Sequence, residues 1–444
     1  MKECIFKRKL YQKMLDWKQS NQGQTALLIE GARRVGKSTL VNQFAKNEYK
    51  SAIIIDFNLA ADRVIQLFDD LMDLDFLFFQ LQQIYQVQLF ERNSVIVFDE
   101  VQRCPKARQA IKYLVADGRY DYIETGSLIS IHQNTMHITI PSEERRLEMH
   151  PMDYEEFSWA LGEDNKYPLL QIALNAKMPM GAAHREQMRK MRLYMLVGGM
   201  PQAVKAYING NNLQQVDEVK RDILKLYAED LIKIDKSQQL SRLFMAIPAQ
   251  LSKNASRYAP TSILPGVDAD RIQQLLHDLE DSKTIHIAYH ANDPNVGMSL
   301  NADYSRFKIY LSDTGLFITL VFWDKDFTEN LIYDKLLSDK LDANLGYVYE
   351  NLVAQMLASQ GNKLFYFTFP KDNKHNYEID FILARGNKVC PIEVKSSRYH
   401  AHSSLDAFCT RFSKRLGKPY IIHTKDLTKE GQLLGLPIYM TELI

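Results

Sequence analysis

The chain has 444 residues, 46% of them hydrophobic and 25% charged, with a formal net charge of +1. This length exceeds that of a typical single domain, so we expect two or three domains in an ordinary globular chain. The nearly neutral charge excludes a general attraction to nucleic acid, so such binding would require a local basic patch.

The N-terminal segment "MKECIFKRKLYQKMLDWK" carries charges throughout and has no apolar core long enough for a signal peptide. No run in the chain approaches the ~20 apolar residues that span a bilayer, which predicts no membrane partner. The four cysteines form no CxxC pair, which argues against a zinc site or a disulfide framework and fits a reducing compartment. We therefore expect a cytoplasmic protein.

A strand, a loop and a helix follow one another in "TALLIEGARRVGKSTLVNQFAK", residues 25–46. The loop matches the phosphate-binding pattern GxxxxGK[ST]. Its glycines allow backbone N–H groups to surround phosphates, Lys37 adds a positive charge, and Ser38 offers a hydroxyl ligand for Mg²⁺. The residues predicted to bind ATP here are Gly31, Ala32, Arg33, Arg34, Val35, Gly36, Lys37, Ser38 and Thr39.

A buried strand is predicted at residues 95–98, and two carboxylates, Asp99 and Glu100, follow it directly. The carboxyl ends of parallel strands lie beside the phosphate loop in α/β sheets. We therefore expect Asp99 to hold Mg²⁺ through water and Glu100 to activate the attacking water. The alternative is that Asp99 only caps a turn. Further strands are expected at 51–58 and 120–127, the second carrying Thr125 as a sensor of the γ-phosphate.

The motifs "GARRVGKST", "FDEVQRCP", "ETGS", "HPMDYEEFSWALG" and "YMLVGGMPQAV" together resemble a widespread family of prokaryotic AAA+ ATPases with a C-terminal domain of unknown function. The resemblance implies an AAA+ core over residues 10–161, followed by a helical region whose "GGMP" turn is typical of the family. It also implies self-association through the core, with Arg103, Arg145 and Arg146 as candidate arginine fingers. A surface ion-pair face is the alternative explanation for the last two.

The middle of the chain predicts helices followed by two strands, "TIHIAYH" and "RFKIYLSD", which is the order of a winged-helix module. Its candidate recognition helix, in residues 268–283, has Ile272, Leu275, Leu276 and Leu279 as an apolar stripe. The same stretch carries five acidic residues against two basic ones, which is the wrong sign for DNA. We therefore favour a spacer or protein-contact module.

The segment "EIDFILARGNKVCPIEVKSS", residues 378–397, predicts a β-hairpin that carries unexpected charges. Glu393 and Lys395 point to one face because strand residues alternate, Asp380 lies on the paired strand, and Glu350 lies on a preceding helix. This series resembles the PD-(D/E)XK nuclease fold, which implies Mg²⁺ binding by Asp380 and Glu393. Lys395 would position water, and Glu350 would serve a second metal or the water. The alternative is a solvated Glu–Lys pair.

A basic stretch follows the hairpin. Residues 385–425 contain nine Lys or Arg side chains (385, 388, 395, 398, 411, 414, 415, 418 and 425) against two acids, Glu393 and Asp406. Such a local excess could hold a nucleic-acid backbone. We therefore expect DNA as a partner of the C-terminal domain.

These observations predict an α/β multidomain chain. The expected parts are an AAA+ P-loop ATPase domain with a parallel sheet (1–161), a helical linker (162–236), a winged-helix-like domain (237–330) and a restriction-endonuclease-like α/β domain (331–444). ATP and Mg²⁺ are the expected cofactors. In the first hypothesis, ATP hydrolysis controls a metal-dependent nuclease domain. In the second, the chain is a nucleotide-switched regulatory or scaffold ATPase whose C-terminal domain binds DNA or a protein without cleavage.

Overall fold

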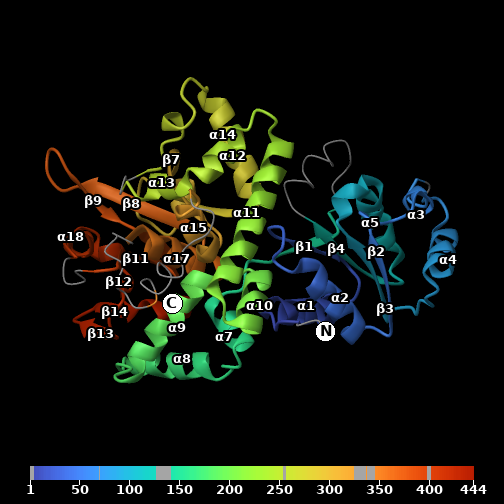
Figure 1. The fold of residues 1–444 in the computed structure, drawn as a ribbon, viewed down its shortest axis with the longest axis horizontal. Helices are drawn as coiled ribbons and strands as arrows, with labels where there is room; N and C mark the ends of the chain where they lie inside the picture. The colour runs from blue at the N-terminus through green and yellow to red at the C-terminus, as the bar shows by residue number, and fades with distance from the viewer. Residues whose placement is uncertain are drawn as a thin grey trace. The chain divides into compact units, whose positions relative to one another are not determined.

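A computed structural model describes residues 5–69, 71–126, 142–253, 257–324, 337, 346–397 and 402–444. The chain forms two compact units, an N-terminal unit (1–150 with 281–283) and a C-terminal unit (151–280 with 284–444) (Figure 1). Within the described ranges, none of the helices combines the length and apolar character needed to cross a bilayer. The cytoplasmic location stays a prediction.

The N-terminal unit alternates strands and helices. Its elements are α1 (Lys9–Asn21), β1 (Ala26–Glu30), α2 (Lys37–Glu48), β2 (Ser51–Asp56), α3 (Asp62–Gln66), α4 (Leu74–Tyr85), β3 (Ser94–Asp99), α5 (Pro105–Asp117), β4 (Asp121–Gly126) and β5 (Glu144–Glu148). The four predicted strands are present. The strand β5 was not predicted, because its charged sequence was interpreted as a source of candidate arginine fingers or as a surface ion-pair face.

The five strands of this unit form one parallel sheet in the order β2-β3-β4-β1-β5. Apolar side chains of α4 and α5 pack with Leu28, Ile53 and Ile96 in one buried cluster, while α2 contacts β2, β3 and β4. Since β4 lies between β1 and β3, the carboxyl ends of these three strands are neighbours. The predicted parallel α/β core is confirmed.

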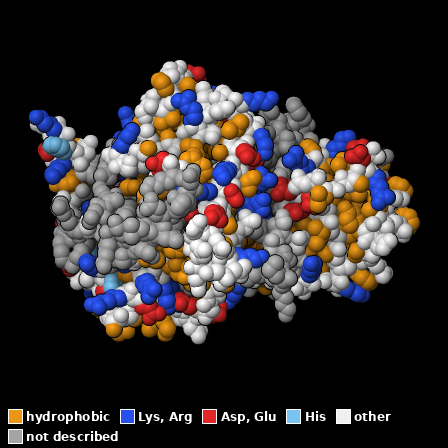
Figure 2. All heavy atoms as spheres, viewed as in Figure 1, with side chains coloured by type: hydrophobic (Ala, Val, Ile, Leu, Met, Phe, Trp, Pro, Cys, Tyr) orange, Lys and Arg blue, Asp and Glu red, His pale blue; other side chains and the backbone are white. Residues whose placement is uncertain are grey.

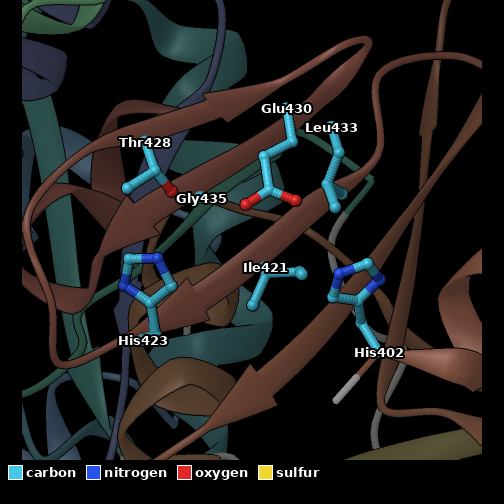
Figure 3. A pocket seen from close by; sticks show the side chains of 7 residues that line it. All are labelled: His402, Ile421, His423, Thr428, Glu430, Leu433 and Gly435. Carbon is cyan, nitrogen blue, oxygen red and sulfur yellow. The ribbon is translucent and has the colours of Figure 1, made fainter. Parts of the chain in front are cut away.

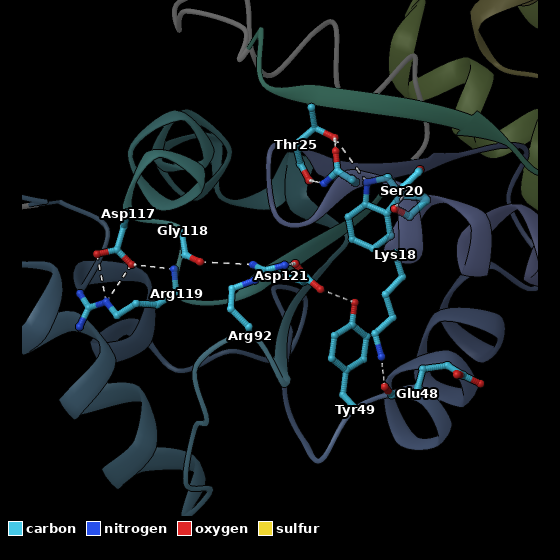
Figure 4. Close-up of polar contacts among 12 residues, drawn as sticks. Lys18, Ser20, Thr25, Glu48, Tyr49, Arg92, Asp117, Gly118, Arg119 and Asp121 are labelled. Atoms are coloured by element: carbon cyan, nitrogen blue, oxygen red, sulfur yellow. Dashed lines mark hydrogen bonds and ion pairs between the residues drawn. The ribbon is translucent and has the colours of Figure 1, made fainter.

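Polar contacts fix the beginning of β4, at the opposite end from the phosphate loop (Figure 4). Asp121 accepts hydrogen bonds from the Tyr49 hydroxyl and from Arg92 Nη2, both at 2.8 Å. Nearby, Arg119 Nε lies 2.8 Å from Asp117 Oδ2. The buried Asp121 carboxylate is therefore satisfied by two donors from neighbouring segments.

The C-terminal unit begins with helices. They are α7 (Tyr154–Ala160), α8 (Lys166–Ala176), α9 (Ala183–Val197), α10 (Pro201–Gly210), α11 (Leu213–Ile234), α12 (Gln239–Met245), α13 (Ile247–Leu251), α14 (Ala269–Asp281), and later α15 (Thr314–Val321), α17 (Gly346–Ser359) and α18 (Ser403–Arg411). In α14 the predicted apolar stripe of Ile272, Leu275, Leu276 and Leu279 is the buried face.

Two sheets complete this unit. One has the order β7-β6-β8-β9 and the other β10-β11-β12-β14-β13. Their strands are β6 (Ile285–Ala291), β7 (Ala302–Leu311), β8 (Leu364–Pro370), β9 (Asn376–Ile379), β10 (Phe381–Arg385), β11 (Lys388–Lys395), β12 (Tyr420–His423), β13 (Thr428–Glu430) and β14 (Leu433–Pro437). The predicted hairpin is the antiparallel pair β10–β11, and β11 continues in parallel with β12.

Two features of the structure concern the expected division of the chain, which stays a prediction. The N-terminal unit ends at His150, whereas the AAA+ domain was predicted to continue to residue 161. Strand β6 of the expected winged-helix domain pairs both with β7 and with β8 of the expected nuclease-like domain. A shared sheet therefore joins these two stretches within one compact unit, and the winged-helix and nuclease-like assignments stay predictions.

The "GGMP" turn is a point of close packing. A Cβ on Gly199 would lie 2.0 Å from the Met152 carbonyl oxygen, and one on Gly198 would lie 2.3 Å from Asp313 Oδ1. Gly199 N–H donates to Asp313 Oδ2 at 2.6 Å, and Asp313 also caps α15. The two glycines therefore let three segments of the C-terminal unit meet without side chains between them.

Candidate nucleotide-binding site and C-terminal carboxylate cluster

The phosphate loop joins β1 to α2 and takes a conformation that favours glycine at two positions. Gly31 has a φ of +154°, and a Cβ there would lie 2.3 Å from the Met149 carbonyl oxygen. Gly36, directly before α2, has a φ of 100°, in the region that glycine adopts without steric cost. Ala32 and Val35 are buried and anchor the loop, while Arg33 and Arg34 are exposed.

Lys37 folds back over this loop. Its Nζ donates to the carbonyl oxygens of Gly31 at 2.9 Å and Ala32 at 3.0 Å. Burial lowers the pKa of Lys37 to about 8, although the carboxylates of Glu100 and Asp99 act in the opposite direction. A phosphate group at the loop would give this buried ammonium a further negative partner and favour its charged form.

Asp99 brings together three of the predicted residues. Its Oδ1 accepts a hydrogen bond from Ser38 Oγ at 2.8 Å and another from Thr125 Oγ1. Ser38 lies in the first turn of α2, Asp99 ends β3, and Thr125 lies near the end of β4. The sheet order therefore gathers side chains that are far apart in the sequence. Thr39 is exposed on the outer side of α2.

Glu100 follows Asp99 in a left-handed conformation, with φ 57° and ψ 47°. A residue with a Cβ pays roughly 1–2 kcal/mol for this conformation. The Glu100 N–H donates to Thr125 Oγ1 at 3.2 Å, and its Oε2 accepts from Gln102 Nε2 at 2.6 Å. Gln102 was not predicted as a site residue. These two contacts orient the Glu100 side chain beside the loop.

Arg8 is a second residue that the sequence analysis missed. Its guanidinium donates to the Val35 carbonyl oxygen at 2.9 Å and to the His150 carbonyl oxygen at 2.6 Å. The side chain is buried just before α1. Arg8 therefore ties the phosphate loop to the end of the segment that follows β5. Nothing in the sequence distinguishes it from the other basic residues of the N-terminus.

The candidate arginine fingers have different surroundings. Arg103 Nε donates to Asn58 Oδ1 at 3.2 Å. Arg146 pairs with Glu144 at 2.8 Å and with Glu30 at 3.5 Å, as an ion-pair face would. Arg145 is exposed on β5. The arginine-finger assignment and self-association through the core stay predictions.

In the C-terminal unit, Glu350 on α17 lies in a network that begins on β7. Lys308 Nζ donates to Glu350 Oε1 at 2.8 Å and to Glu378 Oε1 at 2.7 Å, and Tyr310 donates to Glu350 Oε1 at 2.5 Å. Lys308, Tyr310 and Glu378 were not predicted. A signal was present, because Lys308 and Tyr310 alternate in an apolar run and Glu378 precedes Asp380 by two positions.

The predicted hairpin residues complete this carboxylate cluster, which we define as Glu350, Glu378, Asp380 and Glu393. Asp380 Oδ2 accepts the Val394 N–H at 2.7 Å, and Lys395 Nζ lies 2.7 Å from Glu393 Oε1. Burial first, and the charge of Glu350 second, raise the pKa of Asp380 well above its ordinary value. Glu393 Oε2 is buried and makes no hydrogen bond to the described residues. The structure thus gathers the four residues that were predicted for the C-terminal site, which are Glu350, Asp380, Glu393 and Lys395.

The two predicted metal sites differ in the donors that they offer. Ser38 and Asp99 present two hard oxygen donors beside the phosphate loop, which fits Mg²⁺. In the cluster, Lys308, Tyr310, Lys395 and a backbone N–H already occupy carboxylate oxygens. Among the described side chains, no group of three or more His, Cys, Asp or Glu is arranged to hold a metal ion. Asp380 and Glu393 remain a two-carboxylate candidate.

A small cavity of about 10 Å³ lies on the part of the second sheet formed by β12, β13 and β14. Figure 3 shows His402 and His423 on one side of it and the Glu430 carboxylate on the other. Burial lowers the pKa of His423 to about 4, so its imidazole is neutral near pH 7. The sequence predicted no role for these residues.

Several cationic side chains of the basic stretch form hydrogen bonds or ion pairs within the protein. Arg385 donates to Asn362 and to the Ile444 carbonyl oxygen, and Lys388 donates to the Lys414 carbonyl oxygen. In addition, Lys395 pairs with Glu393 and Arg415 with Asp293. Arg398 lies outside the described residues. Fewer cations than the predicted nine are therefore available for a DNA backbone.

The N-terminal sheet, its phosphate loop and the carboxylates at its carboxyl edge define the class of a P-loop ATPase domain. A family model described as an AAA domain matches residues 23–158 and supports an ATPase of the AAA+ type. Two further models, each described only as a domain of unknown function, match residues 188–326 and 345–439. No curated protein matches the chain.

Solved structures give distant likenesses. A Walker-type ATPase of Pyrococcus abyssi is 17% identical, over 71% of this chain and 96% of that one, with a TM-score of 0.42. The Cdc6 protein of Pyrobaculum aerophilum is 11% identical, over 77% and 97%, with a TM-score of 0.25. The ORC2 protein of Aeropyrum pernix is 11% identical, over 77% and 96%, with a TM-score of 0.28. Because these scores lie below 0.5, none supports an argument about function.

Proposed function

We propose that the chain binds and hydrolyses ATP at the phosphate loop and uses the nucleotide state to control a DNA-binding C-terminal unit. The observation that carries this proposal is the meeting of Ser38, Asp99 and Thr125 at one carboxylate beside the loop. Three strand or helix ends must be correctly placed for that contact, so a chance match of the loop pattern is a poor explanation.

Each residue has a role that follows from its chemistry. Loop N–H groups and Lys37 bind the phosphates, and exchange of the lysine from the Gly31 and Ala32 carbonyl oxygens to phosphate would accompany binding. Ser38 and, through water, Asp99 would hold Mg²⁺, which neutralises phosphate charge when bound. Glu100 accepts a proton from the attacking water, and Thr125 responds to the γ-phosphate through its contact with Asp99.

Lys37→Ala tests the nucleotide site. We expect ATP hydrolysis to fall at least about 100-fold, because a charge aimed at the transferred phosphoryl group is lost. ATP affinity should fall as well, which isothermal calorimetry measures. Lys46→Ala, an exposed lysine on the same helix α2, is the matched control and should retain both properties. Unchanged affinity and rate in Lys37→Ala would remove the proposal.

For the C-terminal unit we propose DNA binding without cleavage as the principal role. The support is that Lys308 and Lys395 already neutralise Glu350, Glu378 and Glu393. A cluster whose charges are compensated by the protein has less need of a metal ion. This is the second hypothesis from the sequence, in which the ATPase is a switch.

Cleavage remains a second candidate because one observation favours it. Glu393 Oε2 is buried without a hydrogen-bond partner among the described residues. The neighbouring Asp380 Oδ2 accepts the backbone N–H of Val394, which follows Glu393 on β11. The decisive assay mixes the protein with ATP, Mg²⁺ or Mn²⁺, and duplex, single-stranded or branched DNA. We expect binding but no product. Cleavage that disappears in Asp380→Asn would instead establish the nuclease and overturn the proposed binding role.

A further inference from the structure

An open groove of about 440 Å³ lies in the C-terminal unit, where the end of α8 meets the beginning of β12 and the β13–β14 turn. Three lysines line it, Lys177, Lys418 and Lys429. The rest of its lining is Gly417, Pro419, Gly431, Gln432 and Leu434. The three cations come from segments separated by up to about 250 positions, so the fold rather than a local sequence run creates the positive charge.

We propose that this groove binds the phosphate backbone of a nucleic acid. The proposal rests on the DNA-binding role described above and identifies the residues that carry it. Only Lys418 belongs to the basic stretch that the sequence analysis singled out, and Lys177 and Lys429 lie outside it.

The lysines of the groove differ from most other cations of this region. Among the described residues, none of the three forms an ion pair, whereas Lys395 and Arg415 are paired with carboxylates. All three side chains are exposed. Burial and the nearby charge of Lys177 lower the pKa of Lys418, which shows that the two ammonium groups repel each other. An anion between them would relieve that repulsion.

The shape of the groove favours a chain of phosphates over other anions. Its lining includes two glycine-containing stretches, residues 417–419 before β12 and the 431–432 turn, and the glycines add no side chain to the groove. A narrow polyanion can enter such a recess, while a flat lipid headgroup surface contacts only its rims. Lysines on more than one side of an open groove are the usual arrangement for following a nucleic-acid backbone.

The groove also has a defined position relative to the carboxylate cluster. In the parallel pair β11–β12, Ile392 lies opposite Tyr420 and Lys395 opposite His423. Lys429 and Leu434, which line the groove, are level with Tyr420, whereas Glu393 is level with Ile421. Because adjacent strand residues point to opposite faces, the groove and Glu393 lie on opposite faces of this sheet.

The test is a binding titration with the full-length chain. Fluorescence anisotropy with labelled single-stranded and duplex DNA, at salt concentrations from about 50 to about 200 mM, gives the affinity and its salt dependence. The variant Lys177→Glu/Lys418→Glu/Lys429→Glu should bind about 10- to 100-fold more weakly. Its slope of log affinity against log salt should fall by about 2 to 3, since three phosphate contacts are lost.

The matched control is Lys205→Glu/Lys236→Glu/Lys253→Glu, which makes the same charge change at exposed positions of the C-terminal unit outside the groove. It should retain the wild-type salt slope. Circular dichroism melts and a Lys→Gln version of the groove variant separate loss of binding from loss of folding.

Three results would overturn the inference in distinguishable ways. If the wild-type chain binds DNA and the groove variant binds with the same slope, the groove is not the site and the proposed DNA-binding role stands. If the wild-type chain binds no DNA at the lowest salt, the proposed role itself fails and the groove inference with it. Loss of binding to phosphatidylserine vesicles, with DNA binding unchanged, would assign the groove to a lipid surface instead.

Discussion

The phosphate loop and the carboxylate cluster each contain a buried lysine, and the protein surrounds the two ammonium groups differently. In the N-terminal unit, Lys37 is buried, and burial lowers its pKa to about 8 against the charges of Glu100 and Asp99. Within the described residues its Nζ donates hydrogen bonds to neutral carbonyl oxygens only. In the C-terminal unit, the buried Lys308 contacts two carboxylates. Burial alone would lower the pKa of Lys308, but the charges of Glu350 and its neighbours raise it well above the ordinary value.

This difference indicates which site awaits a charged ligand. An ammonium beside carbonyl oxygens is under-compensated, and an incoming phosphate would stabilise it. An ammonium between two carboxylates is already compensated, so a ligand must displace an existing ion pair to bind there. The contrast teaches that acidic and basic residues at the expected spacing do not by themselves make a reactive centre.

On the face shown in Figure 2, charged side chains of both signs are interspersed.

The largest expected effect is at Glu100, on the ligand-binding side of the comparison. Glu100→Gln should lower ATP hydrolysis about 100- to 10,000-fold, because the amide cannot accept the proton of the attacking water. ATP affinity should be retained, since Glu100 contacts Thr125 through its backbone N–H, which the substitution preserves. A phosphate-release assay and a binding titration measure the two properties.

The control for Glu100 is Gln102→Ala, which removes the side chain that donates to Glu100 Oε2. It should reduce the rate far less, because Glu100 keeps its carboxylate. If Glu100→Gln hydrolyses ATP at the wild-type rate, another group accepts the proton, and Glu100 is not the catalytic base of the nucleotide site.

Lys308→Met tests the compensated side. Removal of the ammonium leaves the half-buried carboxylates of Glu350 and Glu378 without the buried lysine that pairs with both. Breaking a fully buried pair costs about 3–5 kcal/mol, and the partial exposure of the two carboxylates reduces this cost. We expect a lower melting temperature for the C-terminal unit in calorimetry. Mg²⁺ or Mn²⁺ should raise the melting temperature of the variant more than that of the wild type, since a cation can replace the missing lysine.

Lys363→Met, at an exposed lysine of the same unit, is the control and should melt like the wild type. The double variant Lys308→Met/Glu350→Gln should be more stable than Lys308→Met alone, because one buried charge is removed. A Lys308→Met chain that melts normally without metal would show that the cluster is not held by this lysine.

The sequence predicted different shares of the two regions. The phosphate loop and Asp99 were predictable because a local pattern fixes the loop and an apolar strand places the carboxylate at a sheet edge. Lys308 was not, since its role depends on β7 lying against α17, a contact between segments about 40 positions apart. Arg8 and the groove lysines share that limit, because only the fold brings them to the loop or to one another. The shared sheet of β6 and β8 crossed an expected boundary for the same reason.

Arg8 offers a smaller test of the loop. Arg8→Ala removes donors to the Val35 and His150 carbonyl oxygens, and hydrogen bonds from a charged group contribute about 1.5–3 kcal/mol each. We expect ATP affinity to fall about 10-fold, because part of this energy holds the loop in its binding conformation. Arg8→Lys should recover part of the affinity, whereas Lys13→Ala on the exposed side of α1 should change nothing. Equal affinities in all three variants would confine Arg8 to general stability.

The smallest expected effect on ATP affinity concerns Glu124, a fully buried residue of β4 that lies outside the nucleotide site. Neither of its carboxylate oxygens has a hydrogen-bond partner among the described residues. Burial, with Glu144 nearby, raises its pKa from 4.5 to about 8. The folded chain therefore keeps a proton that the unfolded chain releases, and the free energy of unfolding should fall as pH rises from about 4.5 to about 8.

Glu124→Gln should flatten this fall, because the amide is neutral at every pH in that window. Adjacent strand residues point to opposite faces, so Glu124 points away from Asp99 and Thr125, and ATP affinity should stay the same. Melting temperatures measured across the window, with exposed Glu91→Gln as the control, test the expectation. Parallel curves for the wild type and Glu124→Gln would mean that the carboxylate is compensated in the N-terminal unit as well. A buried charged group without an ion-pair partner among the described residues would then be found at Lys37 but not throughout the N-terminal unit. The difference between the two units would be a difference between Lys37 and the carboxylate cluster alone.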